Sequence, residues 1–167
     1  ARSYNHYPVP GNEREDGVVA LALGLGKSIT DGDHVWSYCP HRATAPPPFK
    51  STGDMLKYTQ NSFWAVNIGD PPAPDPLLET ACLVRSGLKD AEADGTLSFL
   101  ASTYDASSDQ LRAGVSGKGP RALTFAPLLE SRTIPFTPMM DSLLELSCNV
   151  FNGEAEIEIA ANLDTQN

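Results

Sequence analysis

The feature that most constrains this chain is an apolar run that ends in a glycine-rich turn, residues 17–32 (GVVALALGLGKSITDG). Six consecutive apolar residues, Val18 to Leu23, are too many for a strand with one face in water. We therefore expect an interior strand that is covered on both faces. Gly24 and Gly26 then allow the backbone to turn sharply and to approach a ligand closely, because neither residue carries a Cβ atom.

This turn has two interpretations. Lys27 supplies a cation and Ser28 a hydroxyl directly after the two glycines, and such residues together with free backbone N–H groups are typical of loops that cradle phosphate. A Gly-x-Gly turn is also an ordinary end for a strand, and the spacing is neither that of a Rossmann fingerprint nor that of a Walker A motif. Gly24, Gly26, Lys27 and Ser28 are therefore candidate phosphate-binding residues, with a structural turn as the alternative.

The charge balance restricts the partners. The chain has 21 acidic and 12 basic residues, a formal charge of −9. A domain this acidic is repelled by nucleic acid and by anionic lipid, so we expect neither as a partner. No apolar run approaches the roughly 18 residues of a membrane span, and no signal-peptide pattern opens the chain. Cys39, Cys82 and Cys148 form no C-x-x-C pair, which favours reduced thiols in a cytoplasmic protein.

The length of 167 residues suits one domain. Thirteen glycines and fourteen prolines indicate many turns and irregular connections. Two proline-rich stretches, 40–48 and 69–76, break regular structure, and the segment between them is too short to be a domain. We therefore expect a single partial domain over residues 1–167, with both stretches as surface crossings.

The pattern of short strands and turns predicts an α+β fold with a mostly antiparallel sheet and packed helices. Strands are expected at 18–23, 34–38, 63–68, 81–85, 96–102, 121–126 and 154–163. Residues 96–102 alternate with a period of two and are a clear strand pattern. Short helices are expected at 55–58, after a cap at Ser51 or Thr52, and at 86–94. The polar segment 104–109 predicts a hairpin-like connection, and 114–120, with three glycines and Lys118, predicts a flexible loop.

The last third of the chain predicts an amphipathic helix of about four turns. Thr137 followed by Pro138 is typical of an N-cap with proline in the first turn, and Asp141 lies where the helix dipole favours a carboxylate. Apolar residues then recur at helical spacing as far as Phe151. Asn152 followed by glycine is typical of a helix end in the left-handed region.

A second candidate site follows this helix. In the predicted strand 154–163, Glu156 and Glu158 share one face, about 6.5 Å apart along the strand. If the strand faces water, they form its solvated face, which is the usual position of glutamate. If the strand is central, two like charges require a cation, and carboxylate oxygens suit Mg²⁺, which is normally shared with nucleotide phosphates. Both interpretations remain open at this point.

The two candidate sites, in this order, resemble the family of phosphoenolpyruvate synthases and pyruvate phosphate dikinases. Residues 18–26, followed by Ile29 and Gly32, resemble the hydrophobic strand that ends in Gly-Leu-Gly within the family's ATP-grasp nucleotide-binding domain. The helix 137–152 and the segment 155–160 (AEIEIA) resemble its helix followed by an Asp-Ile-Glu-aromatic-Ala strand. Residues 97–105 look like a subgroup of large bacterial phosphoenolpyruvate synthase-like proteins.

The resemblance implies that the chain is the second lobe of an ATP-grasp domain. It implies that Glu158 ligates the Mg²⁺ bound to ATP, with Glu156 at the preceding acidic position. The parent enzyme would bind Mg·ATP and pass a phosphoryl group through a histidine to pyruvate, with no catalytic residue in this chain and no activity of the chain alone. ATP and the remaining domains of the parent chain are the implied partners, and self-association of an uncovered face is a further expectation.

Two departures from the family pattern support an alternative. Many relatives carry Glu directly after Gly-Leu-Gly, where this chain has Lys27. The strand with the family's Gln-x-Arg contact to ATP is expected beyond Asn167, and the first lobe is not in this sequence. The alternative is a degenerate module that has lost nucleotide chemistry and serves as a structural or interaction domain.

Overall fold

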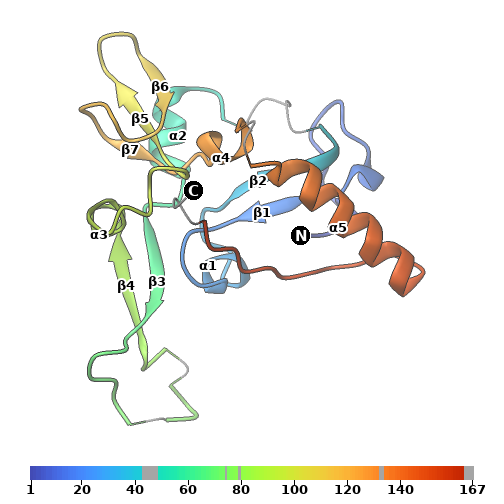
Figure 1. Ribbon diagram of the computed structural model, residues 1–167, viewed down its shortest axis with the longest axis horizontal. Coiled ribbons are helices and arrows are strands. Elements are labelled where there is room, and N and C mark those ends of the chain that lie inside the picture. The colour runs from blue at the N-terminus through green and yellow to red at the C-terminus, as the bar shows by residue number, and fades with distance from the viewer. Residues whose placement is uncertain (43–48, 74, 79, 132–133, 164–167) are drawn as a thin grey trace.

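The computed structural model describes residues 1–42, 49–73, 75–78, 80–131 and 134–163. Its strands form three small antiparallel sheets, and helices pack around them (Figure 1). The predicted class, α+β with antiparallel pairing, is confirmed. Strands of the N-terminal third and the long C-terminal helix form one part of the described chain, and the remaining strands form a second part beside it (Figure 1).

The first sheet pairs β1 (Val19–Leu21) with β2 (Trp36–Tyr38), and Ala20 lies opposite Ser37. The predicted strand 18–23 is therefore shorter than expected. Its end is set by Gln60, whose side-chain amide accepts a hydrogen bond from the Leu23 N–H and donates one to the Leu23 carbonyl, both at 2.9 Å. A side chain thus takes the place of a neighbouring strand at this point.

The second sheet is a two-stranded ribbon, β3 (Ser62–Val66) and β4 (Leu83–Gly87). It confirms the strands expected at 63–68 and 81–85, with bounds shifted by one or two residues. The ribbon projects away from the rest of the chain and ends in a long connection (Figure 1). That connection contains the proline-rich stretch 69–76. Of the other proline-rich stretch, Pro40–Arg42 forms a 3-10 turn, and 43–48 lie outside the described residues.

The third sheet has the order β6-β5-β7, formed by Ser102–Asp105 (β5), Gln110–Ala113 (β6) and Arg121–Ala122 (β7). The hairpin expected near 104–109 is confirmed. The strand expected at 121–126 ends early, because Phe125 takes a left-handed conformation and begins helix α4 (Ala126–Leu129).

The strand predicted at 96–102 is wrong except for Ser102. Residues 94–100 form successive turns, and the Ala101 N–H donates to the Leu97 carbonyl at 2.9 Å. Leu97 and Ala101 are both completely buried. Their spacing of four residues brings them to the same side of a helical turn, so burial of this pair overrides the alternating pattern.

The other short helices are α1 (Lys27–Thr30), α2 (Thr52–Tyr58), α3 (Leu88–Ala93) and the 3-10 turn Arg14–Asp16. Ser51 caps α2, since its hydroxyl accepts a hydrogen bond from the Asp54 N–H at 3.1 Å. This confirms one of the two expected caps. Helix α3 lies within the predicted range 86–94.

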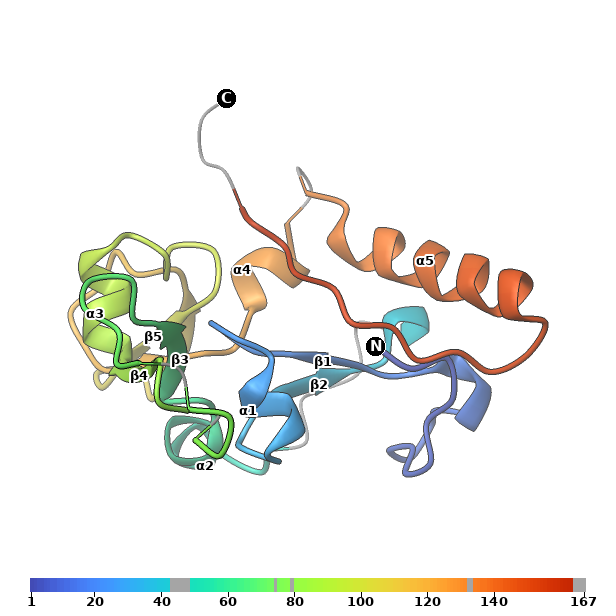
Figure 2. The same ribbon diagram turned by 90° about the horizontal axis from the view of Figure 1, so that it is seen from below.

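Helix α5 (Phe136–Phe151) is the longest helix and confirms the predicted amphipathic segment. Its N-cap is Pro135 rather than Thr137, whose hydroxyl is buried and does not cap the helix. Asn152 has φ 51° and ends the helix as expected. Figure 2 shows α5 on one side of the β1–β2 pair and α1 on the other.

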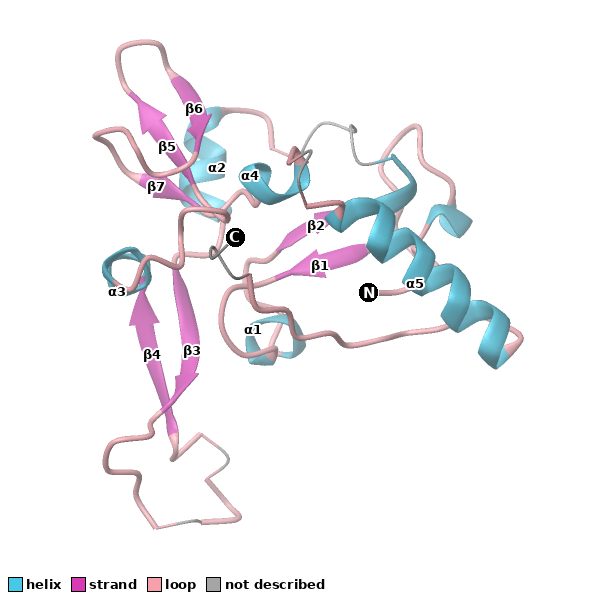
Figure 3. Ribbon diagram, in the orientation of Figure 1, coloured by secondary structure: helices cyan, strands magenta, loops and turns pink. Residues whose placement is uncertain are grey.

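The segment after α5 is extended but is not the predicted strand 154–163 (Figure 3). One bridge joins Glu156 to Arg2, and Arg2 also bridges to Val18. The Ser3 N–H donates to Ala155 at 2.9 Å, and the Ile157 N–H donates to Ala1 at 2.8 Å. Beyond Ile157, no main-chain partner lies within the described residues, so the ladder stops there.

Two buried apolar clusters hold these elements together. The first joins β1 to α4 and α5 through Val19, Leu128, Phe136, Met140 and Leu144. The second is formed by Ala91, Leu97, Ala101, Leu123 and Phe125. Leu21, Leu100 and Leu129 pack against both clusters, so β1, the turn before β5 and α4 link them.

The described helices include none that is long and apolar enough to cross a lipid bilayer. The accessible surface of the chain is 11,042 Å², whereas a compact monomer of 17.9 kDa exposes about 8,000 Å². Exposed large apolar side chains contribute to this additional accessible surface. They lie on the β3–β4 ribbon with its connection and on the outer face of α5. They include Val66, Ile68, Leu77, Leu78, Met139, Leu146, Val150 and Phe151.

Two leucines of α5 test this packing. Leu144 is 5% exposed in the first cluster and Leu146 is 59% exposed. We expect Leu144→Ala to lower the free energy of unfolding by about 3 kcal/mol, because it leaves a cavity. Leu146→Ala, on the same helix, should change it by less than about 0.5 kcal/mol. Urea denaturation followed by circular dichroism measures both, and equal effects would contradict the assignment of the inner face.

Candidate functional site

The glycine turn packs closely against the β3 strand. Gly24 has φ +83°, and a Cβ atom at this position would lie 2.5 Å from the Trp64 carbonyl oxygen. The same oxygen accepts a hydrogen bond from the Leu25 N–H at 2.9 Å. Gly26 has an ordinary backbone conformation and open space where a side chain would stand. Of the two predicted glycines, Gly24 is therefore required by the fold.

The two polar residues of the turn have local surroundings that the sequence does not reveal. The Lys27 ammonium lies 2.9 Å from an Asp31 carboxylate oxygen and 5.8 Å from the centre of the Trp64 ring. Ser28 is 1% exposed, and its hydroxyl has no hydrogen-bond partner among the described residues. Helix α1, which they begin, has four residues. The cation is therefore partly neutralised by Asp31, and Ser28 lies inside the protein.

The acidic pair lies at the surface. The Glu156 carboxylate accepts a hydrogen bond from the Arg2 guanidinium at 2.8 Å, and 62% of its side chain is exposed. Glu158 is exposed as well. Within the described ranges, no hydrogen bond or ion pair joins either carboxylate to the turn 24–28. The charge of Glu156 is thus balanced by the chain's own arginine.

The carboxylates alone do not make a metal site. Among the residues that the structure describes, no group of three or more His, Cys, Asp and Glu side chains is arranged to hold a metal ion. Glu156 lines an open pocket of about 400 Å³ whose other walls are Arg2, Tyr4, His6, Glu154 and Ala155. None of the turn residues lines it. Mg²⁺ takes six oxygen ligands, so this pair could hold it only together with waters and the phosphates of a bound nucleotide.

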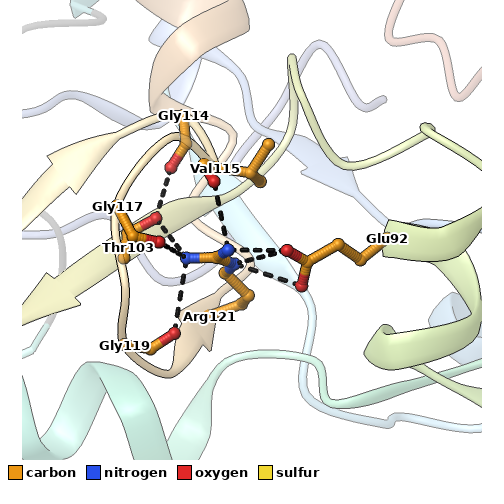
Figure 4. A network of polar contacts seen from close by, with 7 residues as sticks. All are labelled: Glu92, Thr103, Gly114, Val115, Gly117, Gly119 and Arg121. Atoms are coloured by element: carbon orange, nitrogen blue, oxygen red, sulfur yellow. Dashed lines mark hydrogen bonds and ion pairs between the residues drawn. The ribbon is translucent and has the colours of Figure 1, made fainter.

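A polar network that the sequence analysis did not identify surrounds Arg121 (Figure 4). The Arg121 side chain is 13% exposed and lies 2.6 Å from the Glu92 carboxylate. It also donates to the Thr103 hydroxyl at 2.7 Å. Its other acceptors are the carbonyls of Val115 (3.0 Å), Gly117 (2.8 Å) and Gly119 (3.3 Å). The loop 114–120 is therefore wrapped around one guanidinium.

This loop needs a glycine where it closes on β5. Gly119 has φ +152°, and a Cβ atom there would lie 2.0 Å from the Tyr104 carbonyl oxygen. The Tyr104 N–H in turn donates to Pro120 at 2.9 Å. The contacts of Arg121 span 18 residues to Thr103 and 29 to Glu92. No local sequence pattern encodes pairs so distant, although three glycines near an arginine could have suggested a loop closed on a cation.

A pocket of about 330 Å³ lies beside this loop. It is lined by Thr103, Asp105, Arg112, Ala113, Gly114, Ser116, Gly117 and Lys118. Hydrogen bonds from Ser107 and Ser108, with a smaller contribution from the charge of Arg112, lower the pKa of Asp105 to about 2. Its carboxylate lies 2.8 Å from the Arg112 guanidinium. The pocket therefore contains two basic side chains and one carboxylate that stays ionised.

No protein-family model, curated protein or solved structure matches this chain at a significant level. The functional interpretation therefore depends on the residues and on the geometry described above. The resemblance to the phosphoenolpyruvate synthase family stays a prediction from the two sequence stretches.

The two glycines of the turn give a direct test of its packing. Gly24→Ala should lower the free energy of unfolding by at least about 2 kcal/mol, because the methyl group meets the Trp64 carbonyl and the backbone is left-handed. Gly26→Ala should stay within about 1 kcal/mol of the wild type. Thermal or urea unfolding measures the difference. Equal stabilities of the two variants would show that the turn does not press on β3.

The Arg121 network gives a test with a pH readout. Arg121→Ala should destabilise the chain by about 2 kcal/mol, because it leaves the buried Thr103 hydroxyl and the loop carbonyls without their donor. Glu92→Gln should cost less, since 39% of the Glu92 side chain is exposed.

The hydrogen bond from Arg121 lowers the pKa of Glu92 from its ordinary value of 4.5. The ionised Glu92 therefore stabilises the folded state fully above pH 4.5, and this stabilisation is lost as the pH falls through the lowered pKa of Glu92. Unfolding measured between pH 3 and 7 should show a weaker acid dependence in Glu92→Gln than in the wild type. An unchanged dependence would contradict this pairing.

Proposed function

We propose that this chain is the second lobe of an ATP-grasp nucleotide-binding domain in a phosphoenolpyruvate synthase-like phosphotransferase. The observation that supports the proposal is the position of Arg2, which bridges to both Val18 and Glu156. These two residues belong to the two stretches that carry the resemblance. Two stretches that are far apart in the sequence therefore flank the same extended segment, residues 1–3, which supports a site built from both.

The direction of the chain adds to this support. Both bridges of Arg2 are antiparallel, so the segments that contain Val18 and Glu156 run parallel to each other. Each segment continues into its polar candidate residues, the glycine turn on one and Glu158 on the other. Ile157 and Leu163 pack against the same apolar cluster as Val19 and Leu21.

The residues present fit Mg·ATP in part. Carboxylate oxygens are the ligands that Mg²⁺ prefers, and the exposed Glu158 is free to reach one, but further ligands must come from outside the described residues. When bound, the metal would neutralise charge on the phosphates during phosphoryl transfer. The role of this lobe would be positioning, through Glu158 at the metal and backbone N–H groups of the turn 24–28 at the phosphates.

The excess of accessible surface fits a lobe that packs against other domains. The difference from a compact monomer is about 3,000 Å², which exceeds the roughly 1,600 Å² that a standard protein interface buries in total. The apolar side chains on the β3–β4 ribbon and on α5 are suited to such contacts. We propose the remaining domains of a parent chain as the partners, with self-association of the isolated chain as the consequence of their removal.

The second candidate function is a module of the same origin without nucleotide chemistry. Two contacts favour it: Lys27 pairs with Asp31, and Glu156 pairs with Arg2. Both candidate sites would then be satisfied by internal ion pairs. Such a module would act as a structural or interaction domain, using the same exposed apolar surface.

A nucleotide titration of the intact parent protein distinguishes the two functions. We expect a saturable, Mg²⁺-dependent signal with a fluorescent ATP analogue. Glu158→Gln should weaken it at least about tenfold, through loss of a charged ligand. Glu145→Gln, an exposed carboxylate on α5, removes the same charge and should leave binding unchanged.

Two results would decide against this function. If Glu158→Gln leaves nucleotide binding and pyruvate-dependent AMP release unchanged, Glu158 is not a metal ligand. If the wild-type protein gives no saturable signal with Mg·ATP, the interaction module is the correct interpretation.

A further inference from the structure

The pocket between the β5–β6 hairpin and the loop 114–120 has the properties of an anion site. We propose that it binds the phosphate group of a small phosphorylated molecule. Its walls contain none of the residues proposed above for Mg·ATP, namely the turn 24–28 and the pair Glu156 and Glu158. The inference is therefore independent of the proposed nucleotide function.

The first support is the charge of the pocket. Arg112 and Lys118 line it together with a single carboxylate, Asp105. The Asp105 carboxylate is occupied by Arg112 at 2.8 Å and by the Ser107 hydroxyl at 2.6 Å. Among the described residues, Lys118 has no ion-pair partner. The pocket thus carries a net positive charge on a chain whose formal charge is −9.

The second support is the orientation of the loop backbone. The carbonyls of Val115 and Gly117 point at the Arg121 guanidinium (Figure 4). In a trans peptide, the N–H of the next residue points away from the carbonyl that precedes it. The N–H groups of Ser116 and Lys118 must therefore point away from Arg121. Neither donates a hydrogen bond to any described residue, and both residues line the pocket.

Arg121 has a positioning role in this arrangement. It fills the inner side of the loop, so the carbonyl oxygens, which would repel an anion, are turned inward and neutralised. Ser116 and Lys118 line the pocket on the outer side, and their backbone N–H groups, hydroxyl and ammonium are the donors that we propose for the anion. Backbone N–H groups combined with a cation are the usual way in which proteins bind phosphate.

The size of the pocket indicates the class of ligand. Its volume of about 330 Å³ is at the lower end of the range for small-molecule sites. It suits a phosphate or diphosphate group with a small organic part. Nucleic acid is a poor candidate, because the rest of the acidic chain would repel an extended polyanion.

Titration of the full chain with inorganic phosphate and with pyrophosphate, followed by amide chemical shifts, tests the proposal. We expect saturable shifts at Ser116 and Lys118. Lys118→Ala should weaken binding about tenfold, because a charge-assisted contact is lost. Lys89→Ala is the matched control, since Lys89 is an exposed lysine on α3 outside the pocket.

Asp105→Asn gives a change of opposite sign. It removes the negative charge of the pocket and frees Arg112, so phosphate binding should become at least about threefold tighter. Thermal unfolding of each variant verifies that the protein is still folded. Lys118→Glu is a second test that leaves the hairpin contacts in place, and it should abolish phosphate binding.

The proposal is overturned if Lys118→Ala and Lys89→Ala weaken binding equally, which would indicate general charge attraction. It is also overturned if a folded Asp105→Asn binds no more tightly than the wild type. Shifts that disappear in 150 mM chloride would indicate an adventitious ion only.

Discussion

The main-chain hydrogen bonds of residues 1–3 are the constraint on which the part of the structure with the glycine turn and the acidic pair depends. They bind the start of β1 on one side and the segment after α5 on the other. Without them, the C-terminal segment would be held by the apolar contacts of Ile157 and Leu163 and by the side chains of Arg2 and Ser3. The hydrogen-bonded connection between β1 and the segment after α5 therefore runs through three residues of extended backbone, whose position is fixed by six hydrogen bonds.

Local sequence patterns correctly predicted the elements in which the spacing of apolar residues, or the turn residues, indicated only one kind of structure. Helix α5, the cap at Ser51 and the hairpin before β6 were expected from spacing and turn residues, and all three are present. The strand at 96–102 failed because the alternating pattern and the helical pair Leu97 and Ala101 compete within the same residues. Contacts with distant segments decided that competition, and a single sequence contains no information about them.

The candidate sites show the same division between local and distant effects. Gly24 has a left-handed backbone, which favours glycine for a local reason. The Trp64 carbonyl, which leaves no room for a Cβ atom at Gly24, lies 40 residues away in the chain. The ion pairs of Lys27 and Glu156 could not be predicted, because both depend on where the neighbouring segments pack. The Arg121 network was missed for the same reason. Its three carbonyl acceptors carry no side-chain signature at all.

The β3–β4 ribbon has a consequence for the behaviour of the chain in water. Within the described strands, β3 and β4 pair only with each other. The Leu25 N–H covers the outer edge of β3 at Trp64, whereas the outer edge of β4 leaves N–H and C=O groups open. Open edges with exposed valines, such as Val66 and Val84, can recruit a strand from a neighbouring molecule. Arg85 and the prolines of the connection act against this aggregation, because a charge on the strand and residues that cannot extend the ladder disfavour pairing with a second molecule.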